Sequence, residues 1–177
     1  MSAFIDGITI GGIEIQPEAG ARFFQSYVNR RVSTDHLMGD GSISRQTLAG
    51  TDGKLTTRIT GRGIIPLGLQ GIDTKIPQTL KCSAPLSVAS ASNVIDIPAA
   101  RRGDSGYEPA GFAIVGGRRG IHVNSDERRS GDPGGVSGAT AYYVTYYPQI
   151  TALIDIDEQA LDAGNAEYSF SITGTEV

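Results

Sequence analysis

Apolar and polar residues alternate with a period of two along most of the chain, a pattern that is typical of β-strands. The clearest case lies near the start, where Ile8–Ile10 and Ile13–Ile15 flank Gly11-Gly12. Two glycines supply the positive φ values that a two-residue turn requires, so these residues predict a β-hairpin. Further strands are predicted over residues 21–32, 42–48, 54–65, 79–82, 86–97, 112–115, 121–123, 139–147, 150–156 and 166–173.

Turn-forming residues separate these strands at intervals of about ten residues, which favours a β-sandwich or a rolled antiparallel sheet. Residues 33–41 and 66–78 are predicted to be connections, and residues 98–135 a long, loop-rich elaboration. One short helix is predicted around Asp157–Ala163, because acidic residues stand at its start and Gly164 can end it. No boundary separates two parts that each look independent, so the 177 residues are predicted to form a single, mostly β domain.

The composition leaves few groups for chemistry. Cys82 is the only cysteine, and His36 and His122 are the only histidines, which disfavours an internal disulfide and a Cys-based or His-based metal site. Cys82 follows Leu80 in a predicted strand, so we expect a buried and inert thiol. No apolar run approaches the roughly 18 residues of a membrane span. We therefore expect no cofactor, no metal ion and no membrane partner.

Two short motifs resemble chemical sites only in part. Gly103-Asp-Ser-Gly106 resembles the segment around the nucleophilic serine of trypsin-like proteases, but the likeness ends after these residues. His36 also lacks the sequence that flanks the catalytic histidine of that family. Asp155-Ile-Asp157 resembles the start of an EF-hand loop, but the glycine and the glutamate that complete such a loop are missing. The sequence therefore does not predict an enzyme.

Charge is divided along the chain. Residues 1–129 hold all 15 Lys and Arg against 12 Asp and Glu, whereas residues 130–177 hold 7 acidic residues and no Lys or Arg. Because arginine forms several directed hydrogen bonds and is enriched at protein interfaces, we expect complementary patches on identical copies. The candidate subunit contacts are Arg101, Arg102, Arg118, Arg119, Arg128 and Arg129 on the basic side and Asp155, Asp157, Glu158 and Asp162 on the acidic side.

The strongest predicted strand contains four tyrosines, Tyr142, Tyr143, Tyr146 and Tyr147. Alternation predicts that half of them lie in the core and half at a surface or subunit contact. The surrounding segment 136–146 is similar to a strand pattern of immunoglobulin-like and fibronectin-like modules, which also occur on phage capsids and tails. An exposed tyrosine platform would instead suit a module that binds glycans or a host receptor.

Three stretches of the sequence resemble tail-tube and distal-tail ring proteins of long-tailed bacteriophages: the opening hairpin, Lys54–Asp73 and Ala166–Val177. The resemblance covers most of the chain in its layout. It implies a sandwich or rolled sheet flanked by one short helix, hexameric rings joined edge to edge, and stacked rings linked by a loop or terminal arm. It also implies other tail proteins as partners, and DNA that passes through the lumen without specific binding. The loop system at 98–135 departs from that pattern.

These expectations combine into a structural protein of a virion, assembled in the cytoplasm of a host bacterium. Open sheet edges carry unpaired N–H and C=O groups, which favour pairing with another copy. Two alternatives remain open from the sequence, namely a head-decoration protein and a host-binding or glycan-binding module with an immunoglobulin-like second half.

Overall fold

The computed structural model describes residues 7–15, 22–30, 33–48, 53–63, 68–123 and 136–177. The predicted fold class is confirmed, because the described chain is mostly β and its strands form antiparallel sheets. The contacts between residues divide the chain, which the sequence predicts to be a single domain, into two compact units. Unit 1 consists of Met1–Thr9 and Lys81–Ile150, and unit 2 consists of Ile10–Leu80 and Thr151–Val177.

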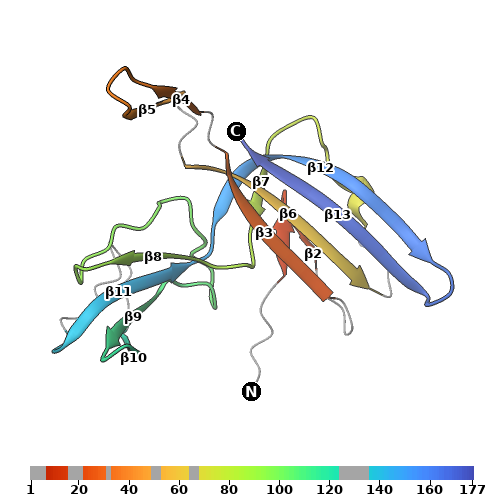
Figure 1. The fold of residues 1–177 in the computed structure, drawn as a ribbon. Coiled ribbons are helices and arrows are strands. Elements are labelled where there is room, and N and C mark those ends of the chain that lie inside the picture. Colours follow the sequence, from red (N-terminus) through yellow and green to blue (C-terminus); the bar gives the residue numbers. More distant parts are fainter. Residues whose placement is uncertain (1–6, 16–21, 31–32, 49–52, 64–67, 124–135) are drawn as a thin grey trace. The chain divides into compact units, whose positions relative to one another are not determined.

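The larger sheet lies almost entirely in unit 2 and has seven strands in the order β2-β1-β7-β12-β13-β6-β3 (Figure 1). Each of the long strands β12, β13, β6 and β3 is antiparallel to its neighbour. The sheet therefore ends with β3 at one side and with β2 at the other. The strands are β1 (Ile8–Ile10), β2 (Ile13–Ile15), β3 (Arg22–Arg30), β6 (Lys54–Gly63), β7 (Gln78–Lys81), β12 (Gln149–Asp162) and β13 (Glu167–Glu176).

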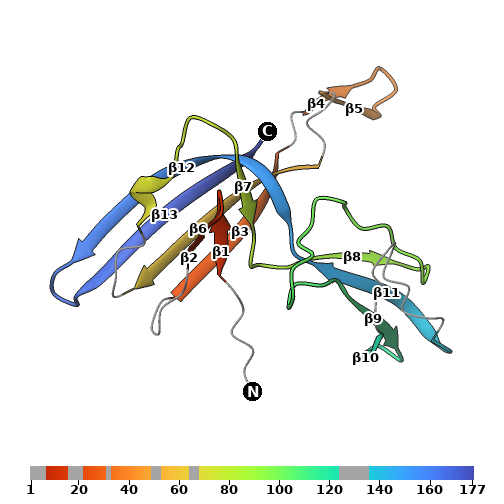
Figure 2. The same cartoon turned by 180° about the vertical axis from the view of Figure 1, so that it is seen from behind.

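The larger sheet rolls over so that its short strands cover its long ones. A Cβ added to Gly174 on β13 would lie 2.8 Å from Leu80 Cδ2 on β7, so these two strands face each other across the core. Figure 2, which views the fold from behind, shows β1 and β7 crossing the direction of the long strands. Alternate residues of each strand point into the space between the layers. The fully buried side chains there include Ile10, Ile15, Ile59, Leu80, Ile154 and Ile172.

The predicted hairpin at the start of the chain is confirmed. β1 and β2 are neighbours in the larger sheet, and Gly11 and Gly12 have φ values of 56° and 85°. The N–H of Gly11 also donates a hydrogen bond to the carbonyl of Thr79, at 2.9 Å. The turn is thus fixed by glycine in the way that the sequence indicates.

The predicted helix around Asp157–Ala163 is wrong, because β12 continues as a strand to Asp162. It pairs with β13 as far as the register pair Asp162↔Glu167. The register shifts between Ile156 and Glu158, which makes Asp157 the extra residue of a β-bulge. Long-range pairing with β13 therefore overrides the local helix signals. The described residues contain one short helical segment, the 3-10 turn Leu69–Gly71, in which Leu69 is buried.

Residues 33–41 were predicted to be a loop, and this is also wrong. They contain β4 (Ser33–Leu37), which pairs with β5 (Ile43–Thr47) in a separate two-stranded sheet. β5 itself agrees with the strand predicted at 42–48.

Unit 1 is built on a four-stranded antiparallel sheet in the order β10-β9-β11-β8. Its core contains Ile95, Ala113, Tyr142 and Val144. Tyr142 and Tyr146 are buried while Tyr143 and Tyr147 are partly buried, which confirms the predicted alternation. The predicted loop at 124–135 lies outside the described residues. The strands are β8 (Leu86–Ser90), β9 (Ala110–Val115), β10 (Arg118–Val123) and β11 (Ala139–Tyr146).

Candidate self-association surface

The hairpin β4–β5 is held by a charged pair across its strands. Asp35 and Arg45 are register partners. Arg45 Nε donates to Asp35 Oδ1 at 2.6 Å, and Arg45 Nη2 donates to Asp35 Oδ2 at 2.7 Å. These hydrogen bonds hold the pKa of the Asp35 carboxyl below its ordinary value. Both side chains are about half exposed, so the pair fixes the geometry of the hairpin more than its stability.

The same hairpin leaves its large apolar side chains exposed. Leu37 and Ile43 face each other beside the turn, and they are 77% and 70% exposed. Met38 and Leu48 are also exposed, at 49% and 60%. A two-stranded hairpin is only marginally stable in water, and exposed apolar side chains that lie together, as the register partners Leu37 and Ile43 do, mark interaction sites.

The last strand of the larger sheet, β3, shows the same property. One edge of β3 pairs with β6 along its whole length, and no described strand pairs with its other edge. Phe24 and Val28 are 67% and 65% exposed. Their register partners are Thr60 and Thr56, so they project from the face of the sheet opposite the buried Ile59.

This outer face is divided by charge. β3 and β6 contain five Arg and Lys and no acidic residue, whereas β12 and β13 contain six Asp and Glu and no Arg or Lys. Arg30 and Lys54 are register partners, and Arg58 and Arg62 lie an even number of residues from Lys54, so these four side chains share the outer face. The fifth cationic residue of the two strands is Arg22. The acidic residues are Asp155, Asp157, Glu158, Asp162, Glu167 and Glu176. Glu176 is the exception to the outer face, because it lies four residues from the buried Ile172 and accepts a hydrogen bond from the N–H of Leu55.

Few of these charges are neutralised within the sheet. Arg62 Nη1 lies 3.8 Å from Glu167 Oε2, and both side chains are largely exposed. Arg58 Nε donates to the hydroxyl of Ser171 at 3.3 Å. Within the part of the chain that the structure describes, no ion pair involves Arg58, Asp155 or Glu158. The outer face therefore presents unpaired positive charge on one side and unpaired negative charge on the other.

A shallow hollow of about 490 Å³ opens between these two sides. It offers hydrogen-bond donors and acceptors from arginine, hydroxyl and carboxylate groups, an arrangement suited to contact and binding. The side chains and backbone that line it belong to Arg58, Thr60, Gly61, Arg62, Glu158, Ser169, Phe170 and Ser171.

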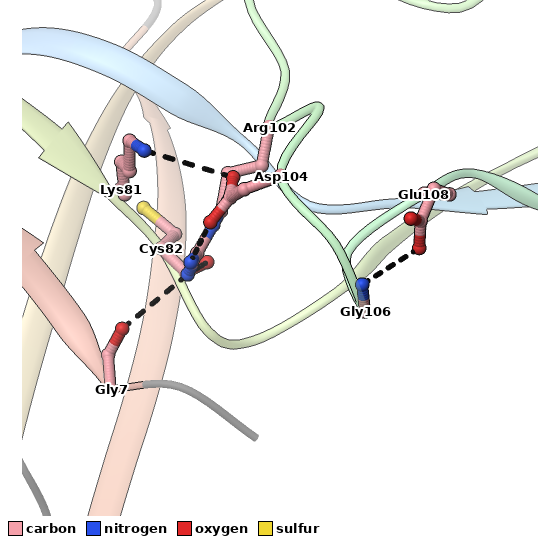
Figure 3. Close-up of polar contacts among 7 residues, drawn as sticks. All are labelled: Gly7, Lys81, Cys82, Arg102, Asp104, Gly106 and Glu108. Carbon is pink, nitrogen blue, oxygen red and sulfur yellow. Dashed lines mark hydrogen bonds and ion pairs between the residues drawn. The ribbon is translucent and has the colours of Figure 1, made fainter. Parts of the chain in front are cut away.

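The prediction that Arg102 contacts a neighbouring copy is wrong, because Arg102 is only 1% exposed and bonds within unit 1 (Figure 3). Arg102 Nη2 lies 2.5 Å from Asp104 Oδ2, and Nη1 donates to the carbonyls of Cys82 and Gly7 at 3.1 and 3.5 Å. The guanidinium carbon also lies 3.2 Å from the centroid of the Tyr107 ring. A buried arginine requires such partners, because an unpaired buried charge is strongly unfavourable.

The other predicted arginines have different surroundings. Arg101 is partly buried, and its Nη1 donates to the carbonyl of Pro98 at 2.9 Å. Arg118 is exposed at the start of β10, and the backbone of Arg119 pairs with Ile114 of β9. Arg128 and Arg129 lie outside the described residues.

The structure brings the predicted acidic residues together on one strand. All four lie between residues 155 and 162 of β12 and are exposed there. Asp157 Oδ2 accepts a hydrogen bond from Thr173 at 2.6 Å, whereas Asp162 accepts from the N–H of Gly164 and the amide of Asn165. Hydrogen bonds to the carboxylate lower the pKa of Asp162. Asp155 and Glu158 thus remain as the acidic residues most open to a partner.

The groups considered for chemistry are placed as follows. Cys82 is fully buried, as predicted. His36 is exposed on β4, and Asp104 of the Gly103–Gly106 motif is bonded to Arg102. In the described ranges, no three or more His, Cys, Asp and Glu side chains gather as a metal site. Those ranges also contain no helix with the length and apolar character needed to cross a membrane.

Sequence reasoning missed the hairpin β4–β5 and the cationic side of the outer face. A signal for the hairpin exists, because Leu37 and Ile43 flank the Asp40-Gly41 turn residues. The sequence signal for the cations is the even spacing of Arg58 and Arg62 in an alternating strand, which places both on one face. The contacts predicted from the sequence were based on adjacent arginine pairs, to which Arg58 and Arg62 do not belong.

Comparisons with protein-family models, with curated proteins and with solved structures found no match to this chain.

Proposed function

We propose that the chain is a non-enzymatic structural protein of a bacteriophage virion, which assembles into stacked, hexameric rings of the tail tube or tail tip. Copies of the chain join through sheet edges and complementary charges. Other tail proteins adjoin the assembled rings, and DNA passes through their lumen without specific binding. Assembly takes place in the cytoplasm of the host bacterium. The resemblance of the opening hairpin, Lys54–Asp73 and Ala166–Val177 to phage tail proteins supports the virion part of this proposal.

One observation carries the self-assembly part, namely the concentration of exposed apolar side chains on β3 and the hairpin β4–β5. Six of the twelve large apolar residues that are exposed in the described chain lie between Phe24 and Leu48. Scattered exposed apolar residues are normal, but a concentration of them marks an interaction site. Such a site on a strand with an open edge favours a partner that itself contributes a strand.

The alternative of a glycan-binding platform finds less support. None of Tyr142, Tyr143, Tyr146 and Tyr147 is exposed, so the strand β11 offers no open tyrosine surface on which a sugar ring would stack. The antiparallel sheet of unit 1 remains compatible with a decoration module, for which isolated knobs or trimers are expected instead of rings or tubes.

The test of the proposal removes the apolar character of the hairpin. The double substitution Leu37→Ser and Ile43→Ser changes two exposed side chains, so the fold is retained while the apolar contact is lost. We expect wild-type protein to form rings or tubes with a central hole in negative-stain images and large species in sedimentation velocity. We expect at least tenfold weaker association for the double variant.

The matched control is the double substitution Ile76→Ser and Val94→Ser, which alters side chains that are 53% and 54% exposed outside β3 and the hairpin. The control variant should assemble as the wild type does. If the wild-type protein stays monomeric at high concentration, the proposed function is wrong. Knobs or trimers would replace the tail assignment with head decoration.

A further inference from the structure

The outer face of the larger sheet identifies which parts of two copies meet. We infer that β3 of one copy pairs with residues 155–162 of β12 of the next copy, so that the chain associates head to tail. This inference rests on the proposed self-assembly. We call β3 with the cationic residues of β6 the basic margin, and residues 155–162 of β12 the acidic margin.

In the described part of the chain, each margin has a strand edge with which no other strand pairs. β3 is the last strand of the larger sheet, and it has nine residues. β12 has fourteen residues, and its neighbour β7 has only four. The N–H of Cys82, which directly follows β7, donates to the carbonyl of Pro148, which directly precedes β12, at 3.0 Å. β7 therefore lies beside the beginning of β12, and no described strand pairs with the edge of the acidic margin that faces away from β13.

Strand direction fits this pairing. β12, β13, β6 and β3 alternate in direction, so β3 and β12 of one copy run opposite to each other. When the next copy repeats the same four strands, its β12 lies antiparallel beside β3 of the first copy. The new pair therefore has the same geometry as every pair inside the four strands, and it satisfies the backbone groups of both open edges.

Charge selects this pairing over a symmetric one. The basic margin contains five cations and no acid, and β12 contains four acidic residues and no cation. Register places Asp155 beside Thr173 and Thr173 beside Arg58, so the unpaired charges of both margins lie on the same face. A two-fold contact of β3 with β3 would bring like charges together, as would a contact of β12 with β12. Only the head-to-tail contact brings opposite charges together.

A head-to-tail contact uses two different surfaces of each copy and therefore repeats. It produces a ring when the rotation between copies closes and a filament when it does not. Exposed charges at its margin fix the register and speed encounter more than they add affinity, so reversal of their sign is the sharpest probe.

The experiment reverses each margin separately. The basic-margin variant carries Arg30→Glu and Arg58→Glu, and the acidic-margin variant carries Asp155→Lys and Glu158→Lys. All four side chains are exposed. We expect each variant alone to associate at least tenfold more weakly than wild type in sedimentation velocity. An equimolar mixture of the two variants should regain assembly, because their reversed margins are again opposite in charge.

The matched control carries Lys75→Glu and Arg118→Glu, which gives the same change in net charge as the basic-margin variant, at exposed positions outside both margins. This control should assemble normally. Loss of assembly in the control would overturn the inference. It would favour instead a contact through the arginines that the sequence predicts. Circular dichroism verifies that every variant is folded, and recovery in the mixture excludes misfolding as the cause of a loss.

Site-specific cross-linking gives an independent readout with little change in charge. Ser26→Cys lies in the middle of β3, and Ala160→Cys lies in the acidic margin of β12. A bismaleimide should link the two proteins to each other when they are mixed, and neither protein to itself. The head-to-tail contact would be overturned if wild type assembled and both charge-reversal variants assembled equally well. It would also be overturned if the Ser26→Cys protein were cross-linked to itself. Either result would leave the proposed function intact. A monomeric wild type would remove both.

Discussion

Arginine is used in opposite ways in the two units. In unit 1, Arg102 is buried and its guanidinium binds Asp104, Cys82 and Gly7. In unit 2, Arg58 is exposed and one of its nitrogens donates to a hydroxyl. The first arginine holds its own unit together, whereas the second forms no ion pair within the residues that the structure describes. Arginine content alone therefore does not identify an interface.

The largest effect expected from this difference follows the removal of Arg102. Arg102→Ala would leave the carbonyls of Cys82 and Gly7 without that donor and Asp104 with only the more distant Lys81 as a cationic partner, at 3.8 Å, which destabilises unit 1 by about 3 kcal/mol. Arg58→Ala should change stability by less than about 0.5 kcal/mol, because the side chain is exposed. Chemical denaturation measures the free energy of unfolding of both variants. Hydrogen exchange over residues 98–109 reports on the surroundings of Arg102. Similar losses for the two variants would contradict the distinction between the units.

A smaller effect is expected in unit 2, where close packing replaces the buried charge. Gly174→Val would place side-chain atoms against Leu80, where even a Cβ would come within 2.8 Å, and should cost about 2 kcal/mol. Gly39→Ala is the control, because a Cβ there meets nothing within 4 Å. Denaturant titration measures the loss.

Leu80→Ala added to Gly174→Val should recover part of the stability, because it removes the atom that clashes. If the loss of unfolding free energy in the double variant equalled the sum of the two single losses, β7 and β13 would not be in contact at this point.

The smallest effect is a pH dependence confined to unit 1. Hydrogen bonds from Arg102 hold the pKa of the Asp104 carboxyl below its ordinary value of 3.8. This pairing therefore stabilises the folded state above the ordinary pKa, and the contribution is lost as the pH falls through the lower, folded-state pKa. Unit 1 should unfold at lower denaturant concentration once the pH is below about 4. Asp104→Asn should remove this acid-dependent part of the loss, and an unchanged pH profile would contradict it.

Local alternation was enough to predict most strands and the fold class. The Gly11-Gly12 hairpin and the alternation of Tyr142 to Tyr147 followed from side-chain period and turn chemistry alone. These features depend on neighbours in the sequence, and the sequence shows such neighbours directly.

The features that were mispredicted depend on distant partners. Asp157–Ala163 carries local helix signals, but pairing with β13 keeps it extended. Arg102 looks like a surface charge until the chain brings Asp104, Tyr107 and Gly7 around it. The opposite charges of the basic margin and the acidic margin also depend on strand order, because β3 and β12 are separated by more than a hundred residues of sequence. No local pattern encodes that order.

The hydrogen bond between Cys82 and Pro148 has a consequence for how this chain can vary. The bond holds the entry and exit of most of unit 1 within 3.0 Å, a separation that a tight turn also spans. The part of unit 1 between Cys82 and Pro148 is therefore an insertion between the neighbouring strands β7 and β12 of the larger sheet. This insertion can therefore differ in length and in its loops, or be replaced by a short turn, without a change in the order of the strands on either side.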